Sequence, residues 1–442
     1  MKDLQLCQKI VDQGLGLGVD EIEVFYYKKK KIEVMIEKND MQIPKGDNYE
    51  GIGIRVFKDG KKGFTATNLL DADSLNDSLR GALAIAEMSP KSPFNKLPEP
   101  KRVNTLTGLI DPNGFSLTID KAVKTAGSLM DILLTDSRIT IDSANLTGAL
   151  STRAIANSKG LKLREDLTNY NSMIFGFAKD GDNISSFDLE YTCDSVFEKL
   201  KIREFAEKLK EKLLKSLGAA TIPSFKGHIV LSPLAVASII IGPLTRAING
   251  REVFNGTSPL KGKKGTQIAN SLLTIIDDPT LAGGPASRSF DREGTPSQRL
   301  PIIRKGRLES FIYDHQTALK AGTCSTGHAV GTSQSISLNC SNIIIEPGKD
   351  DLQQIIKDIK RGIVVNRFSG NTDFTSGDFS GVVKGGYYIE NGEIIKPIRE
   401  VMIAGNLYEI LHNLTHVSSK LNGFSNCFTP HLAFGGISIT GK

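Results

Sequence analysis

Histidine and cysteine residues gather near the C-terminal end of the sequence, at a spacing that suits a metal site. His412 and His416 are four residues apart, which on a helix places both imidazoles on one face. Cys427 and His431 follow closely, so the four side chains form a conceivable zinc ligand set. The residues around His416 are mostly threonine, valine and serine, which are poor helix formers. The alternative interpretation is a pair of half-exposed histidines and a buried thiol.

Two further polar clusters could take part in catalysis or substrate binding. Cys324 and His328 enclose the sequence Ser-Thr-Gly, and a thiol beside an imidazole can act as a nucleophile. A loop packed near a cleft explains the same pattern. Asp291 and Glu293 could serve as paired carboxylates, or as turn residues with satisfied local hydrogen bonds. Asp291, Glu293 and His328 are therefore the candidates for a substrate cleft.

The common hydrolase and nucleotide-binding motifs are missing. The sequence has no HExxH or HExxxH, no G-x-S-x-G and no P-loop. Its five cysteines are widely spaced without a CxxC pair, which favours reduced thiols in a cytoplasmic protein. A net charge of +6 over 442 residues does not demand nucleic acid. The longest apolar run falls short of the ~20 residues of a membrane helix, and the N-terminus lacks the apolar core of a secretory signal.

Residues 1–100 predict a small α+β domain. The expected elements are helices at 3–16 and 72–88 and strands at 21–27 and 31–37. The basic run Lys28–Lys31 is interpreted as a tight turn between two strands, in preference to a DNA-binding patch. Asp59-Gly60 lies between two strand patterns and suits a primed hairpin turn. Four prolines between residues 89 and 100 predict a connector and the first domain boundary.

Two more domains are expected after this connector. Residues 101–218 predict a central α+β domain with a helix at 118–134 and a long helix at 194–217. The expected strands of this domain lie at 138–143, 151–157, 159–166 and 171–179. Gly218 and Pro223 mark the second boundary. Residues 219–442 predict a strand-rich domain with helices at 233–249 and 350–361, which makes the whole chain α+β.

Several segments, in this order, resemble the TldD/PmbA family over essentially the whole chain. They are Gly51–Phe64, Ala82–Ala86, Asp277–Thr280, Phe290–Arg299, Ser325–Ala329, Ser376–Ser380, Gly386–Gly392 and Ala404–Asn406. Each segment is short, but their common order is specific. The Ser-Thr-Gly-His sequence resembles the PmbA/TldE-like branch of the family in particular.

This resemblance implies a relationship to zinc metallopeptidases. TldD-like members are similar to zinc peptidases with an HExxxH helix and a cysteine ligand near the C-terminus, whereas PmbA/TldE-like members lack the histidines and pair with a TldD-like subunit. The corresponding helix here, Ser232–Asn249, contains no histidine and no glutamate. Cys427 falls near the position of the family's cysteine ligand, but a lone thiolate does not make a zinc site.

We therefore expect a non-catalytic subunit of a TldD/TldE-type peptidase that acts on unfolded or short peptides. No cofactor is expected in this chain, and zinc is expected in the TldD-like partner. The protein would be a homodimer when alone. One alternative is a stand-alone homodimeric peptide-binding or structural protein. Another is a divergent metal enzyme that uses His412, His416 and Cys427.

Overall fold

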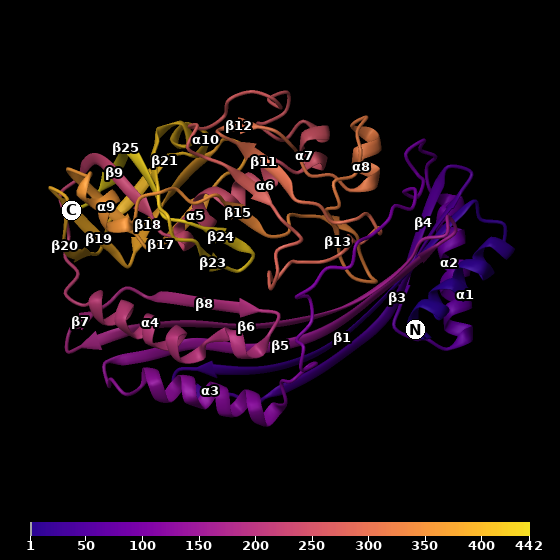
Figure 1. Cartoon of the computed structure of the whole chain (residues 1–442), viewed down its shortest axis with the longest axis horizontal. Coiled ribbons are helices and arrows are strands. Elements are labelled where there is room, and N and C mark those ends of the chain that lie inside the picture. The colour runs from indigo at the N-terminus through magenta and orange to yellow at the C-terminus, as the bar shows by residue number, and fades with distance from the viewer. Residues whose placement is uncertain (1) are drawn as a thin grey trace.

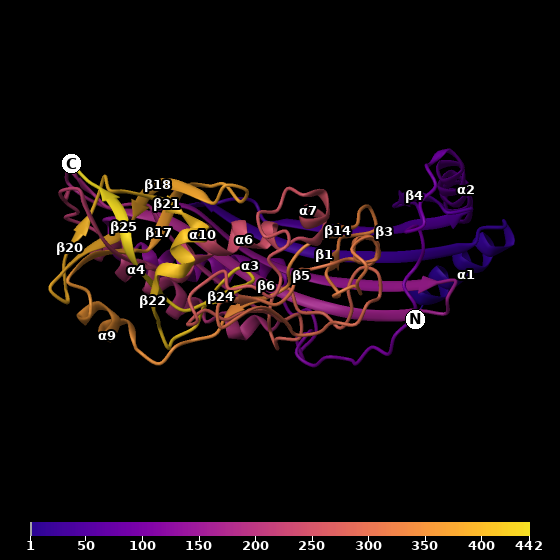
Figure 2. The same ribbon diagram turned by 90° about the horizontal axis from the view of Figure 1, so that it is seen from above.

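The computed structural model describes residues 2–442 and is built in layers (Figure 1). Helices cover one face of a long, curved antiparallel sheet, and the C-terminal half of the chain lies against the opposite face. Figure 2 shows the long strands of this sheet running side by side along the molecule. The α+β class predicted from the sequence is confirmed.

The N-terminal and central segments share this one sheet. Its strands are ordered β4-β3-β1-β5-β6-β7, with β2 paired to β1 and β8 paired to β6. The bounds are β1 Glu21–Glu37, β2 Asp40–Met41, β3 Lys45–Lys58, β4 Lys61–Thr67, β5 Ile139–Asn157, β6 Lys162–Asp180, β7 Asn183–Ile184 and β8 Asp188–Asp194. The connector at residues 89–100 forms no helix or strand, as predicted. It nevertheless joins two segments that are hydrogen-bonded to each other through β1 and β5.

The prediction of a turn at Lys28–Lys31 is wrong, because β1 runs through these residues without a break. Lys28 pairs in register with Glu50 on β3 and forms a 3.0 Å ion pair with its carboxylate. Ile22, Val24 and Tyr26 pack under one pair of helices, and Ile32, Val34 and Ile36 pack under another. Lys28 and Lys30 have the same parity and are exposed between the two hydrophobic clusters. The basic run therefore bridges two cores along one strand.

Four helices cover that face of the sheet. They are α1 (Lys2–Gly16), α2 (Ala72–Met88), α3 (Ile119–Leu133) and α4 (Ile202–Lys215). The predictions for α1, α2 and α3 are confirmed. Thr118 caps α3 by accepting from the Lys121 amide. The hairpin turn at Asp59-Gly60 is also confirmed, since both residues have positive φ and Lys58 pairs with Lys61.

The central segment has fewer and longer strands than predicted. The expected strands at 138–143 and 151–157 are one strand, β5, and those at 159–166 and 171–179 are β6. Glycine and asparagine at 145–150 resemble a turn locally, but the register with β1 and β6 continues through them. The predicted helix at 194–217 is also interrupted. Lys201, with φ of 49°, separates the short 3₁₀ helix η1 (Phe197–Leu200) from α4.

The C-terminal half contains two main sheets around a hydrophobic core. One has the order β17-β18-β21-β25-β9-β16-β19-β20, with β22 paired to β25, and the other has the order β12-β11-β10-β15-β24-β23. The first set comprises β9 Phe225–Leu231, β16 Arg361–Val365, β17 Arg367–Thr372, β18 Asp378–Lys384, β19 Gly386–Glu390, β20 Glu393–Ile398, β21 Met402–Asn406, β22 Leu414–Val417 and β25 Leu432–Thr440. The second set comprises β10 Ile275–Asp277, β11 Leu300–Arg304, β12 Arg307–Leu308, β15 Ile343–Ile345, β23 Asn422–Phe424 and β24 Cys427–Thr429. The strands β13 (Ala329–Val330) and β14 (Ser337–Leu338) pair separately.

A continuous helical segment packs in this core. It consists of α5 (Pro233–Val236), the π-helical turn η2 (Ala237–Ile241) and α6 (Gly242–Ala247), so the helix predicted at 233–249 is confirmed. Ser232 caps its start by accepting from the Ala235 amide, and Pro233 occupies the first helical turn. The remaining short helices are α7 Gly250–Asn255, α8 His315–Lys320, α9 Leu352–Lys357, α10 Leu407–Ile410 and η3 Leu411–Asn413.

Buried charges join the long sheet to the C-terminal half. Glu23 accepts hydrogen bonds from Arg55 at 2.8 Å and from Arg292 at 3.0 Å, and Arg55 also donates to Glu293 at 2.8 Å. The Arg292 guanidinium lies 3.7 Å from the ring centroid of Phe25. Two cations and two carboxylates thus balance one another in a largely buried position, which is the condition under which buried charges are tolerated.

A second pair strengthens the same junction. Arg153 and Glu165 form an ion pair on β5 and β6. Arg153 also donates to the Phe290 carbonyl at 2.9 Å, and Glu165 accepts from the Ser289 amide at 2.9 Å. The loop around residues 288–295 is therefore fixed to the sheet by side chains from several strands. Across residues 2–442, no helix has both the length and the apolar character needed to span a membrane.

Candidate functional site

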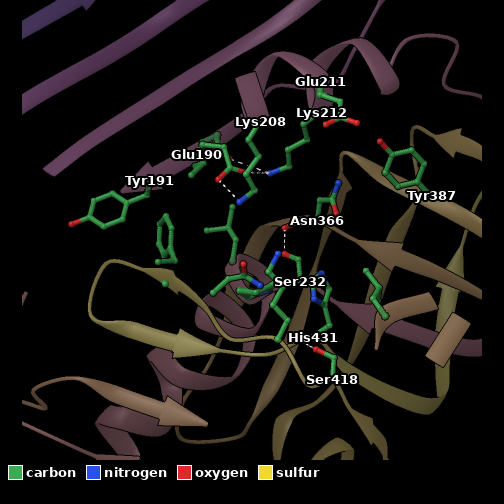
Figure 3. Close-up of a pocket in the computed structure, with 18 of the residues that line it drawn as sticks. Glu190, Tyr191, Lys208, Glu211, Lys212, Ser232, Asn366, Tyr387, Ser418 and His431 are labelled. Atoms are coloured by element: carbon green, nitrogen blue, oxygen red, sulfur yellow. Dashed lines mark hydrogen bonds and ion pairs between the residues drawn. The ribbon is translucent and has the colours of Figure 1, made fainter. Parts of the chain in front are cut away.

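A cleft of about 560 Å³ lies between the central segment and the C-terminal half (Figure 3). Glu190 and Tyr191 come from β8, and Lys208, Glu211, Lys212 and Lys215 come from α4. The opposite wall consists of Ser232, Pro233, Leu234, Asn366, Tyr387, His431 and the segment around residues 418–424. The cleft therefore depends on the docking of the two halves of the molecule.

Lysines at a helical spacing form one wall of this cleft. Lys208, Lys212 and Lys215 lie on one face of α4, while Phe205, Leu209 and Leu213 on another face enter the core. Lys212 donates to Asp188 at 3.0 Å and to Glu190 at 3.3 Å. Burial opposes the charged ammonium, but the two carboxylates outweigh it and raise the pKa of Lys212. Lys212 is thus a fixed cation that ties α4 to β8.

His431 lies deeper in the cleft and remains neutral at physiological pH. Burial lowers the pKa of its imidazole to about 4, and the charges of Lys208, Lys212 and Lys420 act in the same direction. Its backbone is held by Ser418, whose hydroxyl accepts from the His431 amide at 2.9 Å. A neutral imidazole can donate or accept a hydrogen bond, so the ring of His431 could contact a ligand in the cleft in either way.

The helix α5-η2-α6 reaches this cleft with side chains that cannot bind zinc. Pro233 and Leu234 line the cleft, whereas Ser238 lines an adjoining pocket of about 310 Å³ together with Cys427. Burial raises the pKa of the Cys427 thiol to about 12, so it is not a thiolate. Among residues 2–442 there is no group of three or more His, Cys, Asp or Glu that could hold a metal ion.

The histidines at 412 and 416 do not share a helix face. His412 is in η3 and His416 is in β22, where its imidazole lies 3.5 Å from Asp358. Cys427 is in β24, in the other main sheet. The strand arises because residues 414–417 pair with β25, and this pairing replaces the helical spacing that a metal site would need.

Asp291, Glu293 and His328 are buried and do not line the cleft. Asp291 accepts from the amides of Glu293 at 2.8 Å and Thr295 at 2.9 Å, which closes the local turn. Burial raises the pKa of Asp291 to about 7, with a further contribution from Glu293. Glu293 belongs to the charge network at the junction. Asp291 and Glu293 therefore hold the loop around residues 288–295 in place.

Cys324 and His328 do not form a dyad. The His328 ring is fully buried, and its nitrogens are paired with Asp277 at 3.0 Å and with Thr326 at 2.8 Å. Cys324 is exposed on the surface. The sequence does not predict that Lys212, Tyr191 and His431 share a cleft, because they come from three separate segments of the chain.

Comparison with known families shows a metallopeptidase-related protein, and residues 2–442 contain no set of metal ligands. Family models described as PmbA/TldA metallopeptidase domain 1, central domain and C-terminal domain match residues 22–86, 112–217 and 224–441, so the chain belongs to the PmbA/TldD family. The models divide the chain into three parts, although the first two contribute to one sheet.

The chain resembles members of both branches of the family. It is 26% identical to Metalloprotease PmbA of Escherichia coli O157:H7, over 98% of this chain and 97% of the relative. It is 27% identical to the Metalloprotease TldD homolog of Buchnera aphidicola, over 93% of this chain and 90% of the relative. The crystal structure of TldE from Thermococcus kodakarensis has the same fold, with a TM-score of 0.90 at 22% identity and coverage of 99% and 100%.

Proposed function

We propose that this chain is the non-catalytic, peptide-holding subunit of a peptidase whose zinc is carried by a TldD-like partner. The observation that carries the proposal is the helix at the cleft. The helix between Ser232 and Asn249 contains no histidine and no glutamate, and its residues Pro233, Leu234 and Ser238 line the cleft and its adjoining pocket. None of the three can bind a metal or act as a general base. The residues present do not fit a zinc ion.

The cleft itself supports a role in holding peptides. The strand β8 pairs with β6, and β23 pairs with β24; neither has a second neighbour among the described strands. Residues of both strands line the cleft, and the ring of Tyr191 on β8 lies 5.5 Å from that of Phe424 on β23. An extended peptide can add to such an open strand edge through backbone hydrogen bonds, with its side chains in flanking pockets.

The partner and its zinc are part of this proposal. A chain that binds peptides but lacks the first metal shell requires a second subunit to cleave them. In the absence of that subunit we expect a homodimer. A cytoplasmic location agrees with cysteines that remain unpaired, since all five are free thiols.

The test is a peptidase assay of this chain, of the TldD-like protein from the same organism, and of their mixture, with zinc measured in each sample. Hydrolysis of an unfolded peptide that appears or rises at least tenfold in the mixture, with zinc only in the partner, supports the proposal. Lys210→Met in this chain should leave the mixture active, because Lys210 does not line the cleft. Zinc and hydrolysis in this chain alone would contradict the proposal. Failure to associate with the partner would favour a stand-alone peptide-binding protein.

A further inference from the structure

A second concavity lies at the junction between the N-terminal hairpin and the C-terminal half. It has a volume of about 230 Å³ and is lined by Arg55 on β3, Lys62 on β4, Arg251 on α7, and Glu293, Asp314 and Gln316 near α8, among others. Figure 1 places α7 and α8 near the end of the long sheet that carries β3 and β4. It shares no lining residue with the cleft described above.

The carboxylates in this pocket already have partners. Glu293 accepts from Arg55 at 2.8 Å through one oxygen and from the His315 amide at 2.8 Å through the other. Asp314 accepts from Arg251 at 2.8 Å and from the Thr317 amide at 2.7 Å. Each negative charge is therefore matched by a cation and a backbone donor.

Lys62 is the cation of this pocket that has no direct ion-pair partner among the described residues. Its side chain is half-buried, and it makes no ion pair or hydrogen bond with any described residue. Its neighbour Lys61 differs, because the Lys61 ammonium donates to the Glu87 carbonyl at 2.6 Å. Burial lowers the pKa of Lys62, and the charge of Arg55 contributes in the same direction, against the opposing effect of the Glu293 and Asp314 carboxylates. A partly desolvated ammonium that forms no direct ion pair or hydrogen bond is stabilised by an anion that contacts it.

Arg251 is the second cation of the pocket that could bind an anion, because its ion pair uses only part of the guanidinium. Arg251 uses one terminal nitrogen for Asp314, and about half of its side chain is exposed. A guanidinium has further N–H donors that can take a second oxyanion. The volume is below that of a drug-sized ligand site, so it suits a small group and not several residues of peptide.

We propose that this pocket binds a small oxyanion, a carboxylate or a phosphate group, between Lys62 and Arg251. A carboxylate would come from a peptide C-terminus or an acidic side chain, whereas a phosphate would come from a free or esterified phosphate. Both offer the negative oxygens that an ammonium and a guanidinium recognise. The proposal is independent of whether the chain acts with a peptidase partner.

The experiment measures anion binding by calorimetry and thermal unfolding at constant ionic strength. Sodium phosphate, sodium acetate and a tetrapeptide with a free or an amidated C-terminus are each compared with sodium chloride. Saturable binding of phosphate, or of acetate and the free peptide, supports the site and identifies the source of the oxyanion. Bound anion raises the unfolding temperature, and the rise increases with the logarithm of the anion concentration above Kd.

Variants separate this pocket from other surface charges. Lys62→Gln should weaken binding at least tenfold, Lys62→Arg should retain it within about threefold, and Lys61→Gln should leave it unchanged. The conservative arginine variant also shows whether loss in the glutamine variant reflects lost charge or lost folding. Two results would overturn the proposal: no saturable binding beyond that of chloride, or equal affinity in the wild type and Lys62→Gln.

Discussion

Glu23 and Arg292 form a buried ion pair at 3.0 Å, although 269 positions of sequence separate them. The exposed fractions of their side chains are 0% and 1%. Glu23 belongs to the first strand of the long sheet, and Arg292 belongs to a loop of the C-terminal half. This contact and those around it join the two halves of the molecule.

Arg292→Met should lower the free energy of unfolding by about 3–5 kcal/mol, because Glu23 would keep only one of its two cations in a buried site. Chemical denaturation measures the change. Arg304→Met is the matched control, since Arg304 is exposed at the end of β11, and a change of less than about 0.5 kcal/mol is expected there. Equal effects of the two substitutions would mean that the buried network does not hold the junction.

Lys212→Met should destabilise the fold by about 3 kcal/mol. The variant leaves Asp188, whose side chain is fully buried, without its ammonium partner. Lys215→Met tests the same chemistry at the surface, where the ion pair with Glu211 is about two-thirds exposed on both sides. A change of about 0.5 kcal/mol or less is expected for it, measured by urea titration. A neutral effect of Lys212→Met would show that the carboxylates of β8 do not need this cation.

The titration of His431 should make the folded protein less stable as the pH falls. Its pKa in the folded protein is about 4, below the ordinary value of about 6.5. The neutral imidazole therefore contributes stability that is fully present above pH ~6.5 and is lost as the pH falls through about 4. Thermal melts between pH 4 and 7 should show this loss, and His431→Gln should reduce the slope.

The lysines around His431 should tune its titration. Lys420→Met is expected to raise the midpoint of His431, followed by NMR of the ring carbons, because it removes a like charge. Lys210→Met should leave the midpoint of His431 unchanged, because Lys210 donates a hydrogen bond to Thr135 and does not line the cleft. A midpoint near 6.5 in the wild type would contradict the burial of this imidazole.

Substitution of Gly63 and of Gly81 by alanine should change the stability of the protein in opposite directions. A Cβ on Gly63 would lie 1.8 Å from the Ala82 carbonyl oxygen, so Gly63→Ala must push β4 away from α2 and destabilise the protein by more than about 2 kcal/mol. A Cβ on Gly81 would meet only the Thr65 methyl group at 3.5 Å. Because Gly81 is inside α2, Gly81→Ala should stabilise by about 0.5–1 kcal/mol. Differential scanning calorimetry distinguishes the two signs.

Features set by neighbouring residues could be predicted from the sequence. The Asp59-Gly60 turn and the helix predicted at 118–134 depend on local signals, and the structure confirms both. Lys28–Lys31 could not be placed in the same way. Whether a basic run turns or continues depends on Glu50 and on two hydrophobic clusters that form around residues far away in sequence.

The same limit applies to the candidate site. Asp291 and Glu293 stand out as a polar pair, but Glu293 becomes a structural residue only through Arg55, 238 positions earlier. His412 and His416 have a helical spacing that pairing with β25 overrides. The sequence also does not show that Pro233, Leu234 and Ser238 line pockets, because the other walls of these pockets come from distant segments.

The shared sheet also has a consequence during synthesis of the chain. The strand β1 pairs on one side with β3, which follows it closely, but its other neighbour is β5, which begins at residue 139. Until the ribosome has delivered that strand, the nascent chain carries an open edge along β1. The four lysines in the middle of that edge would repel a second nascent chain, so the charge run that resembles a turn can also protect the protein from aggregation while it is being made.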